Sequence, residues 1–483
     1  MANFTWNKKK GAEVFFVSEE AKGQDLFDFA AAHSAFKGKK GEVYSLSFPG
    51  KANRFLVGLG KEEALEDKNA KKEALRLGFF KLAKKAAEVK EEGLQIKLED
   101  FAGTEDAAEF LSAALDGILE ADYKFTKKTQ DEAEEEPSCL NWDFVSESLS
   151  EESFKAVVSE RENFTEGLFL ARDLVNETSN TMYPEVLAEK AEEKLSPLGI
   201  ELTVLDKKAI EEKGMEAFLS VGKGSDKEPR FIVMTYTGDP DSEERTALVG
   251  KGLTYDSGGY CLKSPRGMST MHADMGGAGT VIGTLYALAK NKVKVNATGV
   301  VAACENLISG HAYKTGDIIG SLSGKTIEVL NTDAEGRLTL ADALYYASSE
   351  TAATRVIDLA TLTGAAVAAL SDEYTAALTN DETYFEAFRE AAEASGEKVW
   401  LLPNDENLRK KIKETKVADL QNAATGGAGT ITAGQFVQEF LAEDLPWIHL
   451  DIAGTAYKSS ARAYWPERAT GYHVRALYQL LKG

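Results

Sequence analysis

The apolar residues of the first 150 positions fall into short continuous runs, separated by longer stretches in which they are spaced among charges. Short continuous runs are typical of buried strands, and spaced stretches are typical of helices. The clearest helical stretch is 71–90, where large apolar side chains stand among lysines and glutamates. This pattern predicts a smaller N-terminal α/β domain of residues 1–150, with strands expected at 14–17, 43–48, 54–59 and 94–97.

A helical spacing of apolar residues follows this region, at 151–175, and includes Phe154 and Leu168. We expect a connecting helix there, which leads into a larger C-terminal domain of residues 176–483. Shortly before it, the acidic run at 131–136 predicts an exposed loop near the domain boundary.

Strand-like apolar runs recur in the larger domain and alternate with helical stretches. This alternation predicts an α/β domain with a mostly parallel sheet flanked by helices. Ligands of such sheets bind beyond the carboxyl ends of the strands, so polar clusters that follow the runs are candidate sites. The expected strands are 231–235, 246–249, 297–303, 326–330, 355–359 and 447–452.

The net charge of the chain indicates which kinds of binding partner to expect. The 483 residues include 56 Lys and Arg against 78 Asp and Glu, a net charge of −22. Non-specific nucleic-acid affinity comes from lysines and arginines, so a nucleic-acid partner is not expected. Three scattered cysteines argue against a disulfide framework or a thiolate zinc site. With no signal peptide or membrane span expected either, we expect a cytoplasmic protein without a membrane partner.

Three segments place charged residues beside glycines directly after apolar runs, at 249–263, 271–280 and 331–338. Each is expected to present carboxylates at a strand end. The carboxylates are Asp256, Asp274, Asp333 and Glu335.

Four converging carboxylates would strongly disfavour their joint ionisation unless cations neutralised them. Two divalent ions would balance the four negative charges, so the cluster suggests a dinuclear metal site. Oxygen ligands suit Mn, Mg or Zn better than copper. On spacing alone, separate solvated loop acids remain an equal alternative.

A family resemblance favours the metal site. Residues 331–338, Asn-Thr-Asp-Ala-Glu-Gly-Arg-Leu, reproduce the octapeptide signature of the leucyl (cytosol) aminopeptidase family. The other two segments match the family in order and spacing, as do 304–306 and 358–364, and 429–433 resembles a late family segment. The resemblance extends from about Ala171 to the C-terminus, whereas residues 1–150 resemble the family only in architecture.

The resemblance implies a ligand set for two divalent metal ions, Mn or Zn. One ion would be bound by Asp256, Asp333 and Glu335, and the other by Lys251, Asp256, Asp274 and Glu335. Asp256 and Glu335 would bridge the two. A ligating lysine must be neutral, and two adjacent cations would lower its pKa enough to allow that.

The resemblance also implies the reaction and the assembly. Peptides with a free N-terminus would lose an N-terminal, preferably apolar and leucine-like, residue by attack of a metal-bridging water. Lys263 would polarise the scissile carbonyl, and Arg337 would hold a bicarbonate ion that acts as general base. The family implies a homohexamer.

Two departures from the family pattern concern His272, where relatives usually have Lys or Arg, and Pro265, which falls one residue later than is common. Both bear on substrate preference more than on the reaction. The glycine-rich stretch 276–280 lacks the Lys-Ser/Thr ending of a P-loop, so close packing or a helix start is expected there. The rival functions are a dinuclear phosphoesterase, a DNA-binding role without catalysis, and a degenerate structural homologue.

Overall fold

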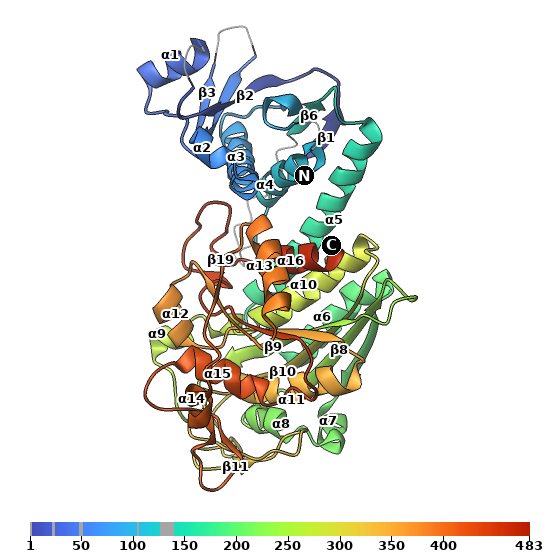
Figure 1. Ribbon diagram of the computed structural model, residues 1–483, viewed down its shortest axis with the longest axis vertical. Helices are drawn as coiled ribbons and strands as arrows, with labels where there is room; N and C mark the ends of the chain where they lie inside the picture. The colour runs from blue at the N-terminus through green and yellow to red at the C-terminus, as the bar shows by residue number, and fades with distance from the viewer. Residues whose placement is uncertain (1, 22–24, 48–51, 104–105, 126–139) are drawn as a thin grey trace. The chain divides into compact units, whose positions relative to one another are not determined.

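The computed structural model describes residues 2–21, 25–47, 52–103, 106–125 and 140–483. Its chain divides into two compact units (Figure 1). The first unit contains Met1–Thr165 and Ala461–Pro466, and the second contains Glu166–Ser460 and Glu467–Gly483. Helix α5 (Glu151–Asn176) covers the stretch expected to form the connecting helix. The acidic run at 131–136 and Cys139 lie outside the described residues.

The first unit is built on a six-stranded sheet, which is parallel except for the pairing of β3 with β4. Its four predicted strands are present, whereas β1 and β6 were not predicted, because each is short and mixes polar with apolar residues. Helix α3 (Lys68–Glu88) starts where Asp67 accepts a hydrogen bond from the Ala70 amide. In sheet order the strands are β1 (Asn3–Trp6), β6 (Asn141–Val145), β5 (Gly93–Lys97), β2 (Ala12–Ser18), β4 (Arg54–Gly60) and β3 (Val43–Leu46).

The second unit contains an eight-stranded sheet whose four central strands are parallel, as predicted. Antiparallel pairings join β14 to β17 on one side, and β8 to β10 and β7 to β8 on the other. In sheet order the strands are β15 (Val399–Leu401), β14 (Thr375–Thr379), β17 (Trp447–Asp451), β13 (Arg355–Ala360), β9 (Thr246–Asp256), β10 (Asn296–Asn306), β8 (Arg230–Thr237) and β7 (Glu201–Leu205).

One predicted strand of this sheet was wrong. Within 326–330 only Ile327–Glu328 form a strand, β12, and it pairs with β11 (Ile318–Ile319) and β16 (Leu420–Gln421) in a separate three-stranded sheet. The strand has only two residues, and Leu330 is 40% exposed to solvent. The run is therefore too short and too exposed to be a central strand of the main sheet.

Helices cover both faces of the large sheet (Figure 1). On one face lie α6 (Pro184–Leu195) and α10 (Gly276–Lys290), and on the other lie α8 (Glu216–Gly222) and α11 (Gly336–Glu350). Since β9 is covered on both sides, almost all of its residues are buried, as in other central parallel strands. Among the described helices, none is both long and apolar enough to cross a membrane.

Helix α10 lies unusually close to β9. A Cβ added to Gly277 would stand 2.8 Å from the Lys251 backbone nitrogen of β9 and 2.1 Å from the Leu359 carbonyl oxygen of the neighbouring strand β13. One added to Gly250 would stand 2.7 Å from the Gly277 carbonyl. Only glycine allows this approach. The stretch 276–280 is therefore a helix start packed against the sheet, as predicted.

Candidate metal centre

Asp256 is the last residue of β9 and lies at the carboxyl end of the sheet, where the sequence pattern predicts it. Its side chain is 1% exposed. Its Oδ1 accepts hydrogen bonds of 2.8 Å from the Gly258 amide and from Asn306 Nδ2. Asn306 is its register partner at the end of the parallel neighbour β10. Gly258 has a φ of +86°, which permits the turn that returns the chain over the carboxylate.

Asp333 and Glu335 come from the segment between β12 and α11. Asn331 holds this loop, since its Oδ1 accepts from the Asp333 amide at 2.9 Å. Glu335 occupies the N-cap position of α11 and is 2% exposed. The positive end of the helix dipole favours a carboxylate at that position.

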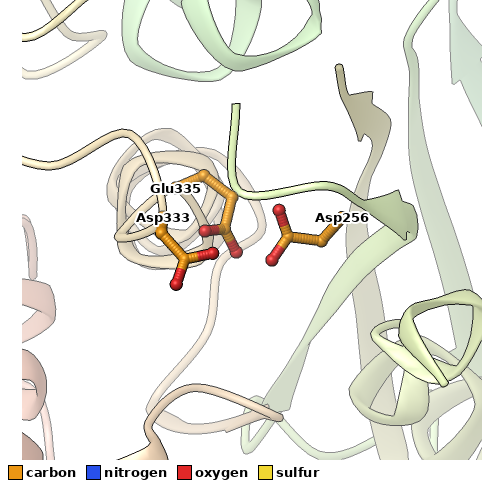
Figure 2. Close-up of side chains that lie close together, drawn as sticks. All are labelled: Asp256, Asp333 and Glu335. Atoms are coloured by element: carbon orange, nitrogen blue, oxygen red, sulfur yellow. The ribbon is translucent and has the colours of Figure 1, made fainter. Parts of the chain in front are cut away.

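The three carboxylates of Asp256, Asp333 and Glu335 converge (Figure 2), with one oxygen of each within 4.8 Å of the others. Glu335 Oε2 is buried and has no hydrogen-bond partner among the described residues. A buried polar atom without a hydrogen-bond partner costs free energy, and a bound cation would remove this cost for Glu335 Oε2. The donor set therefore fits a divalent metal ion that prefers oxygen ligands.

Lys251 adds a nitrogen to the buried side of this cluster. Its Nζ lies 2.7 Å from Asp274 Oδ2 and 2.9 Å from Glu335 Oε1. Space for the lysine comes from Gly336, where an added Cβ would stand 2.5 Å from Lys251 Cε. The sequence-predicted ligands Lys251, Asp256, Asp274, Asp333 and Glu335 are thus brought together in one place.

The expected placement of Asp274 at a strand end was wrong. The chain leaves the sheet after β9, forms the short helices α9 (Pro265–Met268) and η3 (Met271–Ala273), and returns to the sheet at Asp274, just before α10 begins. Because α10 packs closely on β9, the turn just before this helix places the Asp274 carboxylate beside Lys251.

Lys263 lies on the other side of the cluster. Its Nζ is 2.8 Å from Asp256 Oδ2 and 2.5 Å from Asp333 Oδ1. Its side chain is 18% exposed, in contrast with 3% for Lys251. Lys263 therefore faces the more accessible part of the site.

The electrostatics of the cluster reflect its crowding. Burial, together with the charge of Asp256, raises the pKa of Glu335 to about 8. Burial also raises the pKa of Asp274 to about 6, against the opposing effect of Lys251. For Lys251, burial disfavours the ammonium form, but the nearby carboxylates outweigh it and the pKa is raised. A metal ion bound by these groups would have to displace protons.

Arg337 lies in the first turn of α11 and is 8% exposed. Its Nη1 donates to the Asn422 carbonyl at 2.7 Å, whereas its Nε has no hydrogen-bond partner among the described residues. Burial lowers the pKa of its guanidinium to about 10. The Arg337 side chain is thus held through Nη1, and its Nε–H is available to donate a hydrogen bond to a ligand.

Some residues around the cluster were not predicted. Thr361 Oγ1 donates to Asp274 Oδ1 at 2.6 Å, and the Thr361 carbonyl accepts from Lys251 Nζ at 2.9 Å. The sequence signals for Thr361 are its place in the family-like segment 358–364 and its position after β13, at the carboxyl end of a parallel strand. His272, which precedes Asp274 in the chain, packs edge-on against Tyr457 and lies 3.3 Å from Arg468 Nη2.

Comparisons with known proteins agree with this geometry. The family model described as the catalytic domain of the cytosol aminopeptidase family matches residues 169–478, and that of the family's N-terminal domain matches residues 16–131. The second match corrects the expectation that the first 150 residues resemble the family only in architecture.

Individual relatives match over nearly the whole chain. The probable cytosol aminopeptidase of Treponema denticola is 46% identical over 482 residues, 99% of both chains. That of Clostridium perfringens is 47% identical over 454 residues, 92% of this chain and 90% of the relative.

Solved structures agree as well. The bottromycin maturation enzyme BotP in complex with Mn matches with a TM-score of 0.85 and 32% identity, covering 98% of this chain and 99% of that one. A tomato leucine aminopeptidase mutant matches with a TM-score of 0.87 and 31% identity, covering 100% of this chain and 96% of that one. The chain therefore belongs to the cytosol aminopeptidase family and is a metal-dependent aminopeptidase.

Proposed function

We propose that this aminopeptidase removes apolar, leucine-like residues from peptides with a free N-terminus, using two divalent metal ions, Mn or Zn. The observation that carries the proposal is the convergence of Asp256, Asp333 and Glu335, together with the buried Glu335 Oε2, which has no hydrogen-bond partner among the described residues. The structure of BotP in complex with Mn supports a divalent ion of this kind.

The two ions would share the ligands unequally. Asp256, Asp333 and Glu335 would hold one ion, and Lys251, Asp256, Asp274 and Glu335 the other. The contacts of Lys251 with Asp274 and Glu335 support the second group. When bound, the ions would supply Lewis-acid activation of the attacking water and a binding point for the substrate α-amine.

Lys263 and Arg337 would be the catalytic side chains. The carboxylates beside Lys263 outweigh the effect of burial and raise its pKa. The raised pKa supports a protonated Lys263 that stabilises the developing oxyanion. Arg337 would hold a bicarbonate ion, which supplies a general base. Its spare Nε donor supports this role, and every carboxylate of the cluster is already assigned to a metal ion.

The assembly and location belong to the same proposal. A homohexamer is supported by the family resemblance, and a cytoplasmic location by the naming of the relatives as cytosol aminopeptidases. Light scattering should give about six times the chain mass of 52.4 kDa. A stable, fully active monomer at micromolar concentration would contradict the hexamer.

The decisive experiment tests the free amine. An N-acetylated substrate has an amide nitrogen whose lone pair is delocalised, so it loses both a ligating and a positioning contact. We expect kcat/KM for Leu-p-nitroanilide to exceed that for its N-acetylated form by about 10³-fold or more. Comparable values at equal metal occupancy would contradict the exopeptidase proposal, and turnover of phosphate esters instead would favour the phosphoesterase.

A further inference from the structure

The turn that follows β13 touches the buried side of the metal centre. Strand β13 ends at Ala360, and residues 361–363 lead into the short helix α12 (Gly364–Leu370). Thr361 makes two contacts there: its hydroxyl donates to Asp274 Oδ1 at 2.6 Å, and its carbonyl accepts from Lys251 Nζ at 2.9 Å. One residue thus orients both side chains that distinguish the second metal ion's ligands from the first's.

A second carboxylate fixes this turn from behind. Asp451, at the end of β17, is 1% exposed. Its Oδ1 accepts from the amides of Leu362 at 3.2 Å and Thr363 at 3.4 Å, and its Oδ2 accepts from Thr363 Oγ1 at 2.6 Å. The Thr363 hydroxyl in turn accepts a hydrogen bond from the Ala366 amide in the first turn of α12.

These contacts clamp one peptide group at both ends. The peptide between Thr361 and Leu362 directs its carbonyl to Lys251 and its N–H to Asp451. Since a peptide group is rigid and planar, the carboxylate on one side fixes where the lysine nitrogen can lie on the other. A neutral lysine has one lone pair and two hydrogens, so a carbonyl that takes one hydrogen limits where the lone pair can point.

We propose that Thr361 and Asp451 are positioning residues for one of the two metal ions, the ion assigned to Lys251 and Asp274. This inference rests on the proposed ligand set, although neither residue is itself a ligand in it. Partners that hold ligands in place commonly change metal affinity by about 10- to 100-fold when they are removed. The effect should fall on one site only, because neither residue has a hydrogen bond or ion pair to Asp333 among the described contacts.

The test compares Thr361→Val, which removes the hydroxyl but keeps the shape, with Thr361→Ser, which keeps the hydroxyl. Metal-free protein is titrated with Mn²⁺, and the two dissociation constants are measured by calorimetry. We expect Thr361→Val to weaken one binding event by about 10- to 100-fold and leave the other within about threefold, and Thr361→Ser to restore it. Thr284→Val is the matched control, since that buried hydroxyl donates to the Thr280 carbonyl of its own helix and has no other hydrogen bond within the described part of the chain.

Asp451→Asn should weaken the same binding event by a smaller factor, because an amide oxygen can still accept from the backbone while the acceptor for Thr363 Oγ1 is lost. Unchanged affinities, or equal weakening of both sites, in Thr361→Val would overturn the positioning role. Asp274→Asn separates this failure from that of the ligand set. If Asp274→Asn weakens one site and Thr361→Val does not, only the positioning role falls, and if Asp274→Asn leaves both sites unchanged, the proposed ligand set falls.

Discussion

The two lysines of the metal centre lie in opposite surroundings, although each is paired with two carboxylates. Lys251 and its partner Asp274 are 3% and 5% exposed, and they come from a central strand and from the turn just before a long helix. Lys263 and its partner Asp333 are 18% and 33% exposed, and both lie on loops. The first pair is enclosed by regular structure, and the second is open to solvent.

This difference separates two tasks within one cluster. A buried charged group must be paired and held by its surroundings, so the Lys251 side is suited to keeping ligands in place. A group that stabilises charge on a substrate must be reachable by it, so the Lys263 side is suited to the reaction. Glu335 pairs with Lys251 and Asp256 pairs with Lys263, and the proposed ligand set assigns both carboxylates to both metal ions.

The largest effect is expected from removing what both sides share. Glu335→Ala should lower kcat/KM by about 10³-fold or more, because this carboxylate is assigned to both metal ions. Activity and metal content per chain are the measurements. Glu350→Ala, at the exposed far end of the same helix, should change neither. Near-normal turnover of Glu335→Ala with two metals bound would show that the ligands are wrongly assigned.

The next largest effects are expected from replacing each of the two lysines in turn. Lys263→Met should keep two metals per chain but lower kcat by roughly 10²- to 10³-fold, because a charge that stabilises the transition state is lost. Lys251→Met should instead lower the metal content toward one per chain. Elemental analysis beside steady-state kinetics distinguishes the two outcomes, and the reverse pattern would exchange the roles of the two sides.

A smaller effect is expected from Gly336→Ala. Alanine is favoured over glycine in helices by up to about 1 kcal/mol, yet the added Cβ would stand 2.5 Å from Lys251 Cε. We expect about tenfold weaker binding of one metal, without loss of thermal stability. Gly364→Ala is the matched control, because Gly364 is also the first residue of a helix and has nothing within 4 Å of an added Cβ. Equal metal affinities in both variants would mean that Lys251 tolerates displacement.

The smallest effect concerns pH and stability without metal. Burial and Asp256 raise the pKa of Glu335 from 4.5 to about 8, so the native state binds a proton more tightly than the unfolded chain. This stabilisation is complete below pH 4.5 and is lost as the pH rises through about 8. The Tm of metal-free Glu335→Gln should therefore fall less steeply than that of the parent protein between these values. Parallel curves for the two proteins would contradict the raised pKa.

The sequence pattern predicted the start of β9, at 246–249, and the carboxylate of Asp256 at a strand end. It missed the rest of the strand, because residues 250–255 mix glycines and polar residues with apolar ones. It misplaced Asp274, because residues 257–273 leave the sheet before that carboxylate is reached. The edge strands β7 and β15 and the inner strand β14 were not predicted. Strand β14 reads Thr-Ala-Ala-Leu-Thr, with mostly small side chains, and its antiparallel pairing with β17 depends on distant residues.

Of the site, the sequence predicted the residues that lie in its motifs. Lys251, Asp256, Asp333 and Glu335 lie within motifs whose spacing is visible in the chain. The role of Thr361 is not, since it depends on a backbone carbonyl and on Asp451, which stands ninety residues further along the chain. Contacts made by backbone atoms leave no trace in residue type, except where glycine is required.

The glycine contact between α10 and β9 has a consequence for which cations fit. The backbones of β9 and α10 are in contact at Gly250 and Gly277, where no side chain can change its rotamer to make room. This contact therefore sets a minimum distance between the backbone of Lys251 and the start of α10. A smaller ion could not be accommodated there by moving the helix inward, because the helix already rests on the strand without a side chain between them. An adjustment to a smaller ionic radius would therefore have to come from side-chain rotamers or from the loop that carries Asp333. The minimum distance between the two elements is set by two residues that have no side chain at all.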